Sequence, residues 1–430
     1  MAEMHLAKGE GPACLSQPSA RPLYPDGRCY VDPIGTAGVE GPYSASYQRA
    51  LKKRIGEVLH GSRAVTKAQL FSGMRGAFPS VVIAQVMGTR FEALVKTSCQ
   101  NDCPPEAEYL PELHPLDFEW YFTRDCASEL ARWFAGARRE ILCIGTPTVA
   151  GALATLGQRT RLLDRNPAVL LRFPQLRNSQ SVYLNDIAQA NEIRCRADVV
   201  ILDAPWYLRD ILAWVATAAQ LVKPWGVVAL SLFPPLVRPT AETERQKILD
   251  FLSGIGDTEV VEGALAYETP LFEREALRQT NLEQAGNWRR GDLVIVKVRH
   301  KISGRRQQLQ IPADPDWRTF WVSGQVIKTR VRKRRRPDAS ELLAKVDGLT
   351  SFTYPTVSAR DTHRDMIDLW TSRNRVAQVG DFGIVTNVLH QMQEGVQLSE
   401  ALRRASSTQS PGRILLSSEL KLREVLESKE

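Results

Sequence analysis

The sequence contains few of the residues that build metal centres or disulfide frameworks. Its seven cysteines are scattered over 430 residues, and Cys99 and Cys103 form the closest pair. No second pair lies nearby, so the spacing does not fit a structural zinc site and no metal is expected. An odd, sparse set of cysteines is typical of proteins in a reducing compartment.

Long apolar runs are also missing. The sequence has no stretch of about 18 apolar residues that could span a membrane. Its N-terminus lacks the apolar core of a secretory signal peptide. We therefore expect an intracellular, soluble protein that does not associate with membranes. Its expected compartment is the cytoplasm, and the nucleus is the alternative.

The bulk composition indicates a multi-unit globular protein. Hydrophobic residues make up 43% of the chain and charged residues 24%, which is ordinary for soluble proteins. A length of 430 residues favours roughly two to four units. The formal net charge of +8 favours a polyanionic partner weakly.

The first hundred residues divide into an arm and a small helical module. Residues 1–44 are rich in Gly and Pro and predict a flexible arm. Within 45–105, apolar spacing predicts a helix over 47–59, and Thr66-Lys67-Ala68-Gln69 has the form of a capping box that opens a second. A third helix at 80–86 and a strand at 90–96 follow. This order resembles a winged helix-turn-helix, which would contact nucleic acid; the alternative is a packing module that contacts only protein.

From residue 140 the pattern changes to alternating strands and helices, which is typical of a parallel α/β sheet. Apolar runs without alternation predict buried strands. The expected strands are 141–144, 160–164, 181–186, 197–202, 227–233, 259–267 and 292–298. Residues 271–290 are polar and are interpreted as an insertion.

The last part of the chain, 301–430, is interpreted as a basic, mostly helical region. A hairpin is expected at 317–331, and helices at 340–347, 384–405 and 413–428. A dense basic run stands between them. It contains Lys328, Arg330, Arg332, Lys333, Arg334, Arg335 and Arg336. Clustered cations of this kind fit phosphate contacts with a nucleic-acid substrate; the alternatives are a solvated surface run or a localisation signal.

The segment Asp203-Ala204-Pro205-Trp206 stands where the apolar run at 197–202 ends. In open α/β sheets, ligands bind at the carboxyl ends of the strands. There the acid can accept a hydrogen bond from an amino group, and the proline fixes the turn. Trp206 or Tyr207 can stack on a planar ring. Taken alone, the segment could equally be a turn with a core tryptophan.

Three neighbouring features would form a ligand site with this segment. Gly145-Thr146-Pro147 follows the first strand and precedes a helix, so the backbone can approach an anionic or nucleotide-like ligand. The loop lacks the GxGxxG pattern, which disfavours a dinucleotide. Asp164 ends the second strand, where an acid commonly holds ribose hydroxyls. Asp186 ends the third. Each acid alone could be a solvated turn residue, but together they indicate a site.

These features resemble a known family. Seven strands in this order, with Lys223-Pro224-Trp225-Gly226 before the fifth, look like a class I S-adenosylmethionine-dependent methyltransferase with a Rossmann-like sheet. The segment from Asp203 to Trp206 resembles the Asp-Pro-Pro-aromatic motif of amino-group methyltransferases. The loop from Cys143 to Pro147, with Trp120-Tyr121-Phe122 upstream, is similar to the adenine-N6 methyltransferase-like family, which includes ribosomal RNA adenine and elongation-factor lysine methyltransferases. The resemblance covers 115–300.

The resemblance implies S-adenosylmethionine as cofactor and adenine-N6 methylation of DNA or RNA as the reaction. Gly145, Thr146 and Pro147 would lie against the cofactor, Asp164 would hold its ribose and Asp186 its adenine. Asp203 and the Ala204 carbonyl would orient the target amino group, which Pro205 and Trp206 frame and Tyr207 contacts.

Two alternatives stay open. The same tetrapeptide can orient a lysine amine, so the chain could be a protein-lysine methyltransferase. Ala204 stands where the family has proline, so the chain could instead be a catalytically silent nucleic-acid-binding scaffold that also binds a protein partner.

Overall fold

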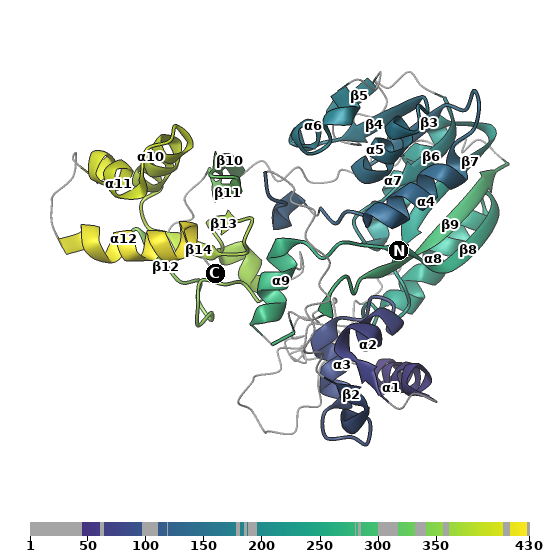
Figure 1. Cartoon of the computed structure of the whole chain (residues 1–430), viewed down its shortest axis with the longest axis horizontal. Coiled ribbons are helices and arrows are strands. Elements are labelled where there is room, and N and C mark those ends of the chain that lie inside the picture. The colour runs from purple at the N-terminus through teal and green to yellow at the C-terminus, as the bar shows by residue number, and fades with distance from the viewer. Residues whose placement is uncertain are drawn as a thin grey trace, which may run out of the picture.

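The computed structural model describes residues 45–60, 64–96, 111–117, 119–177, 181–184, 187, 196–279, 281–282, 285–299, 317–331, 341–355, 361–406 and 413–427 (Figure 1). The expected arm at 1–44 lies outside these ranges. The proposed borders near 105 and 300 also fall in segments that are not described, so the domain limits stay predictions.

A seven-stranded sheet forms the centre of the fold, in the order β5-β4-β3-β6-β7-β9-β8. The first five of its strands in the chain pair in parallel, and β9 is antiparallel to both of its neighbours. This order and direction define the class I methyltransferase fold, so the predicted fold class is confirmed. The strands are β3 (Ile141–Ile144), β4 (Thr160–Asp164), β5 (Ser181–Leu184), β6 (Ala197–Leu202), β7 (Val222–Leu232), β8 (Gly256–Ala266) and β9 (Arg290–Val298).

Helices cover both faces of this sheet, which is why its central strands are apolar without alternation. Leu142 and Ile144 of β3 pack in one core, with α7 (Leu208–Leu221) and α8 (Ala241–Ser253). Ile141 and Cys143 of the same strand pack in the other, with α4 (Arg124–Phe134) and α5 (Pro147–Thr155). Full burial of one such aliphatic side chain stabilises the fold by about 1.5–3 kcal/mol.

The segment Lys223–Gly226, which the sequence predicts as a turn before the fifth strand, lies inside β7. It loops out as a bulge, because Ala197 pairs with Val222 but Val199 pairs with Val227. Trp225 has a φ of 64°, a conformation that suits glycine. The expected turn is therefore a bulge within a longer strand.

The N-terminal module contains the three expected helices, α1 (Ala45–Leu59), α2 (Lys67–Gly73) and α3 (Pro79–Val86). The capping box is confirmed, because the Thr66 hydroxyl accepts a bond from Gln69 N and the Gln69 side chain accepts one from Thr66 N. The expected strand at 90–96 is instead a 3₁₀ turn, η1 (Glu92–Leu94), followed by β2 (Val95–Lys96), which pairs with β1 (Val65–Thr66). Over 45–60 and 64–96 the structure shows no wing hairpin.

The segment at 271–290, which the sequence predicts as an insertion, packs against the N-terminal module. It forms α9 (Leu271–Arg278), and Leu277, Leu282 and Trp288 lie in the buried core of the N-terminal module. The segment therefore joins the module to the sheet. A buried ion cluster ties the same two parts together: Asp292 of β9 contacts Arg75 at 2.8 Å and Arg245 at 2.9 Å.

The C-terminal part is less helical than the sequence predicts. The hairpin is confirmed as β10 (Trp317–Val322) and β11 (Gln325–Arg330), but it belongs to a five-stranded sheet, β10-β11-β13-β14-β12. The other strands are β12 (Leu343–Ala344), β13 (Leu369–Thr371) and β14 (Val376–Val379). The helix expected at 340–347 is wrong, since β12 lies there. These strands have two to four residues, too few to show a period in the sequence.

The helices expected after this sheet are present. The one predicted over 384–405 is two helices, α10 (Phe382–Gln393) and α11 (Leu398–Ser406), separated at Gly395, which has a φ of 89°. The last is α12 (Arg413–Leu426). In the parts of the chain that the structure describes, no helix is long and apolar enough to cross a membrane.

Candidate active site

The carboxyl edge of the central sheet brings together three of the predicted site positions. Ile144 pairs with Leu163 on one side and with Leu202 on the other. Gly145, Asp164 and Asp203 end or directly follow these paired strands, so they lie side by side where the order of the sheet reverses. This is the place where open α/β sheets bind ligands.

Asp203 is held by side chains from β7 and from the residue that follows β8. The Tyr267 hydroxyl donates a 2.9 Å hydrogen bond to Asp203 Oδ1. Ser231 Oγ lies 2.5 Å from the same hydroxyl. Burial raises the pKa of Asp203 to about 7, although hydrogen bonds from Tyr267 and Ser231 favour the charged form. The carboxylate is thus an oriented acceptor that takes up a proton near neutral pH.

Trp206 is fixed by the same group of residues. Its Nε1 donates to Ser231 Oγ over 3.2 Å, and its ring meets Tyr267 edge-on at 5.6 Å. The guanidinium of Arg289 lies over the Trp206 ring at 4.5 Å and over the Trp120 ring at 4.0 Å. The Arg289 guanidinium therefore lies between the Trp120 and Trp206 rings.

The rest of the tetrapeptide shapes the turn that leads into α7. Ala204 is buried, and Tyr207 N donates to the Pro205 carbonyl over 2.6 Å. This short backbone contact closes the turn, and Tyr207 occupies the position immediately before the helix. Pro205 and Tyr207 are partly accessible. The roles predicted for the Ala204 carbonyl and for Tyr207 stay predictions.

The backbone conformation and the packing at Gly145 both require a residue without a side chain. Gly145 has a φ of 62°. A Cβ atom on it would lie 3.0 Å from the Trp214 ring and 3.2 Å from the Asp203 carbonyl oxygen. Only glycine fits this turn without displacing the backbone of Asp203. Gly145 therefore connects the predicted cofactor loop directly to the predicted catalytic residue.

The residues after Gly145 begin helix α5. Thr146 is buried, and its hydroxyl donates to the Ile201 carbonyl over 3.4 Å. Pro147 occupies the first turn, where its missing N–H costs nothing. The Thr148 hydroxyl is buried and has no hydrogen-bond partner within the part of the chain that the structure describes. An unpartnered hydroxyl beside a helix N-terminus is suited to a polar ligand group.

Asp164 lies in an acidic cluster that the sequence does not reveal. Burial, and then the negative charge of Glu119, raise the pKa of Asp164 to about 7. Asn166 N donates to Asp164 Oδ1 over 2.9 Å, and the Asn166 side chain donates to Glu119. Arg172 forms a buried ion pair with Glu119 at 2.8 Å. Glu119 is thus neutralised by Arg172, and the role predicted for Asp164 toward a ribose stays a prediction.

These features fit the cofactor that the fold family implies. The acceptor at Asp164, the unpartnered Thr148 hydroxyl and the turn at Gly145 lie along one edge of the sheet. Asp186, the third predicted cofactor residue, lies outside the described residues. Groups of His, Cys, Asp or Glu that could hold a metal ion are not found in the described part of the chain.

Several residues of the site come from segments to which sequence patterns assigned no role. The sheet order brings three of them to Asp203 and Trp206, because β7 pairs with β6 and the strands β9 and β8 continue the sheet beyond β7. They are Tyr267, Ser231 and Arg289. One available signal was Ser231, a polar residue within the apolar run at 227–233. Trp120 was marked only as part of the family resemblance.

The basic run is described only at its start. Lys328 pairs with Asp117, and Arg330 Nε donates to the Ile367 carbonyl over 2.8 Å. Both side chains are thus directed to protein partners, which does not favour the phosphate contacts predicted for them. Arg332, Lys333, Arg334, Arg335 and Arg336 lie outside the described residues.

Comparisons with known proteins find likeness in structure only. No family model and no curated protein matches the sequence. A branched-chain polyamine synthase from Thermus thermophilus is 14% identical, with 60% of this chain and 92% of that chain covered and a TM-score of 0.45. An rRNA methylase from Streptococcus thermophilus is 13% identical, with 41% and 94% covered and a TM-score of 0.25. The N-methyltransferase NodS from Bradyrhizobium japonicum is 19% identical, with 41% and 96% covered and a TM-score of 0.28.

Proposed function

We propose that this protein is an S-adenosylmethionine-dependent methyltransferase that methylates an amino nitrogen, and that this nitrogen is adenine N6 in a nucleic acid. The observation that carries the proposal is the position of Asp203. Its carboxylate stands at the carboxyl end of β6, beside the cofactor-type loop at Gly145, and is oriented by Tyr267.

The Asp203 carboxylate supports transfer to an amino group because it is an acceptor with a raised pKa. In its charged form it accepts a hydrogen bond from the target N–H and directs the nitrogen lone pair. With a pKa of about 7 it can also take the proton that the nitrogen loses. Tyr267 holds the carboxylate in one orientation, so positioning contributes to the rate.

The bound cofactor would supply an electrophilic methyl group on a sulfonium. With the cofactor bound, the nitrogen–methyl bond would form as the sulfur–methyl bond breaks, and the product would be S-adenosylhomocysteine with a neutral sulfur. The proton leaves the nitrogen through Asp203 and then passes to solvent. Asp164 and the start of α5 at Thr146–Thr148 would hold the cofactor, through its ribose and its polar groups.

A planar substrate is supported by the aromatic residues around Asp203. Trp206 is partly exposed, and a purine would stack on the ring face that Arg289 does not cover. In a duplex, the target base would have to leave the base stack before it could reach Asp203. These features favour adenine over a lysine side chain, which has no ring to stack.

The experiment is transfer of labelled methyl from S-adenosylmethionine into total RNA, genomic DNA and total protein, with hydrolysis of the product to identify the modified base. N6-methyladenine is the expected product, and Asp203→Asn is the control for background. If label appears only in protein, the substrate is a lysine side chain and not adenine. Failure to bind the cofactor in isothermal titration would overturn the methyltransferase assignment itself.

A further inference from the structure

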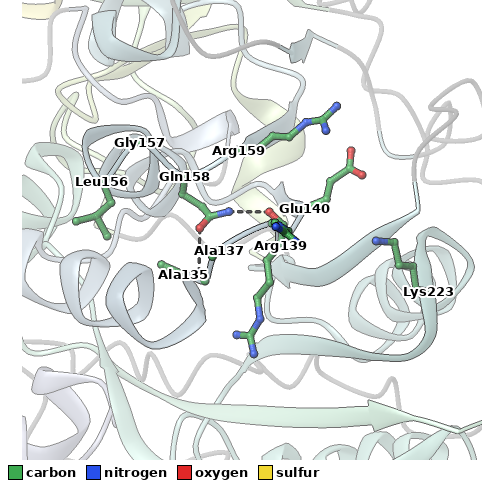
Figure 2. A pocket seen from close by; sticks show the side chains of 11 residues that line it. Ala135, Ala137, Arg139, Glu140, Leu156, Gly157, Gln158, Arg159 and Lys223 are labelled. Carbon is green, nitrogen blue, oxygen red and sulfur yellow. Dashed lines mark hydrogen bonds between the residues drawn. The ribbon is translucent and has the colours of Figure 1, made fainter.

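A basic hollow lies at the edge of the central sheet opposite the candidate active site. Its volume is about 760 Å³, and its walls are the loops before β3 and β4 and the start of β7 (Figure 2). These are the amino ends of parallel strands, whereas Asp203 lies at a carboxyl end. A strand of four residues such as β3 separates the two edges by about 13 Å.

The hollow has an excess of positive charge. Four cations line it, Arg138, Arg139, Arg159 and Lys223, against a single acid, Glu140. The charge of Glu140 is balanced by Arg161 at 2.6 Å, outside the lining. The cations come from three segments that are separate in the chain, and Figure 2 labels one from each of them.

Two of the four cationic side chains interact with other groups of the protein. Lys223 pairs with Asp198 at 2.8 Å, and Arg139 donates to the Phe134 carbonyl at the end of α4 over 3.3 Å. Arg138 and Arg159 are exposed, and neither side chain makes a hydrogen bond or an ion pair within the described residues. Arg138 and Arg159 therefore present two guanidinium groups to a ligand.

The loop that carries Arg138 is held in place by Gln158. The Gln158 side chain donates to the Arg139 carbonyl over 2.6 Å and accepts from Gly136 N over 3.0 Å. Arg138 itself has a φ of 68°, which is uncommon for a residue with a side chain. Gln158 therefore fixes the backbone of the loop from which the Arg138 side chain extends.

Three exposed apolar side chains line this hollow or stand close to its lining residues in the chain. Leu156 lines the hollow and is 52% exposed. Trp133 precedes the lining residue Ala135 by two positions and is 53% exposed, and Trp225 follows Lys223 by two positions and is 64% exposed. Solvent-exposed tryptophans beside arginines are the combination on which single-stranded nucleic acids bind, since bases stack on the rings and phosphates pair with the cations.

We infer that this hollow, with Trp133 and Trp225, binds a single-stranded stretch of nucleic acid through its backbone and stacked bases, separately from the site at Asp203. Such a surface would hold a long strand at a second point without reading its sequence. The inference does not depend on the proposed reaction, because binding at this edge can be measured whether or not methyl transfer occurs.

The test is binding of a fluorescein-labelled 15-nucleotide oligouridylate to the full chain, followed by anisotropy at several salt concentrations. We expect Arg138→Glu/Arg159→Glu to weaken binding at least tenfold and to lower the salt slope by about 1.4, since about 0.7 is expected for each phosphate contact to a single strand. The matched control is Lys52→Glu/Lys247→Glu, which makes the same charge change at exposed residues of α1 and α8.

A second variant tests the stacking contribution. Trp225→Gly removes the ring and suits the positive φ at that position, so its fold should be retained. We expect at least fivefold weaker binding. Unchanged binding by the arginine variant, or an equal loss in the lysine control, would overturn the inference. Equal competition by a polyglutamate peptide of matched charge would also overturn it, because the hollow would then bind any polyanion.

Discussion

The hydroxyl of Tyr267 donates a 2.9 Å hydrogen bond to Asp203 Oδ1 and so joins the end of β8 to the end of β6. These two residues are 64 positions apart in the chain. Their contact sets both the orientation and the charge of the carboxylate, because the donated hydrogen bond favours the ionised form while burial opposes it. Both residues should therefore affect the rate of methyl transfer, and each in a different way.

Asp203→Asn should lower methyl transfer at least about 100-fold, the scale for loss of a positioned acid-base group. The amide keeps the size of the side chain but cannot accept the proton. Cofactor affinity, measured by isothermal titration, should change less than threefold. Turnover near the wild-type level would refute the role assigned to Asp203, and a large loss of cofactor affinity would place Asp203 in cofactor binding instead.

Tyr267→Phe should shift the acidic limb of the pH–rate profile upward. The wild-type limb is expected near pH 7, the pKa of Asp203, since the charged form is the acceptor. Removal of the donor raises that pKa further, so activity falls at neutral pH and recovers in alkaline buffer. Tyr354→Phe, in the C-terminal part, is the control and should leave the profile unchanged. A uniform loss of rate at every pH would contradict this role of Tyr267.

The free energy of unfolding should depend on pH through Asp203. Its folded-state pKa of about 7 lies above the ordinary value of 3.8, so the folded protein binds the proton more tightly than the unfolded chain. Stability contributed by this group is therefore greatest below about pH 4 and is lost as the pH rises through 7. The free energy of unfolding should fall by about 2 kcal/mol as this contribution is lost, a figure reduced because solvent partly screens the carboxylate.

Urea denaturation at pH 5.5 and pH 8 checks this dependence. Asp203→Asn should lose less stability between the two pH values than the wild type, because the amide does not ionise. The control is Asp257→Asn, at an exposed ion pair with Arg299, which should lose as much as the wild type. An equal loss in Asp203→Asn and the wild type would show that Asp203 does not titrate in this range.

The sequence predicts the central sheet well because its inner strands are uninterrupted apolar runs buried on both faces. Val199 to Leu202 form one such run, and the acid that follows it marks the strand end. The C-terminal sheet could not be predicted in this way. Leu343–Ala344 and Leu369–Thr371 are too short to show a period, and the partners that make them strands are distant in the chain.

For the site, local patterns locate the residues at parallel strand ends but not those that support them. Asp203, Gly145 and Asp164 each end or follow a recognisable strand. Tyr267 and Arg289 reach the site because β9 pairs antiparallel to β7 and β8 pairs with β9, and that register is set by nonlocal packing. The Trp120–Arg289–Trp206 stack likewise joins three separate segments, so no window of the sequence contains it.

The buried cluster around Asp292 supports a final prediction on stability. Asp292 is fully buried between Arg75 and Arg245 and also accepts from Gly263 N over 2.7 Å. Asp292→Asn leaves the two guanidinium groups without a buried counter-charge, which should cost about 3–5 kcal/mol in the free energy of unfolding. Glu262 is the other partner of Arg75, and its own side chain is 68% exposed. Glu262→Gln should therefore cost less than about 1 kcal/mol. Urea denaturation of both variants measures the difference. Similar costs for the two would show that burial of Asp292 does not govern the attachment of Arg75 to the sheet.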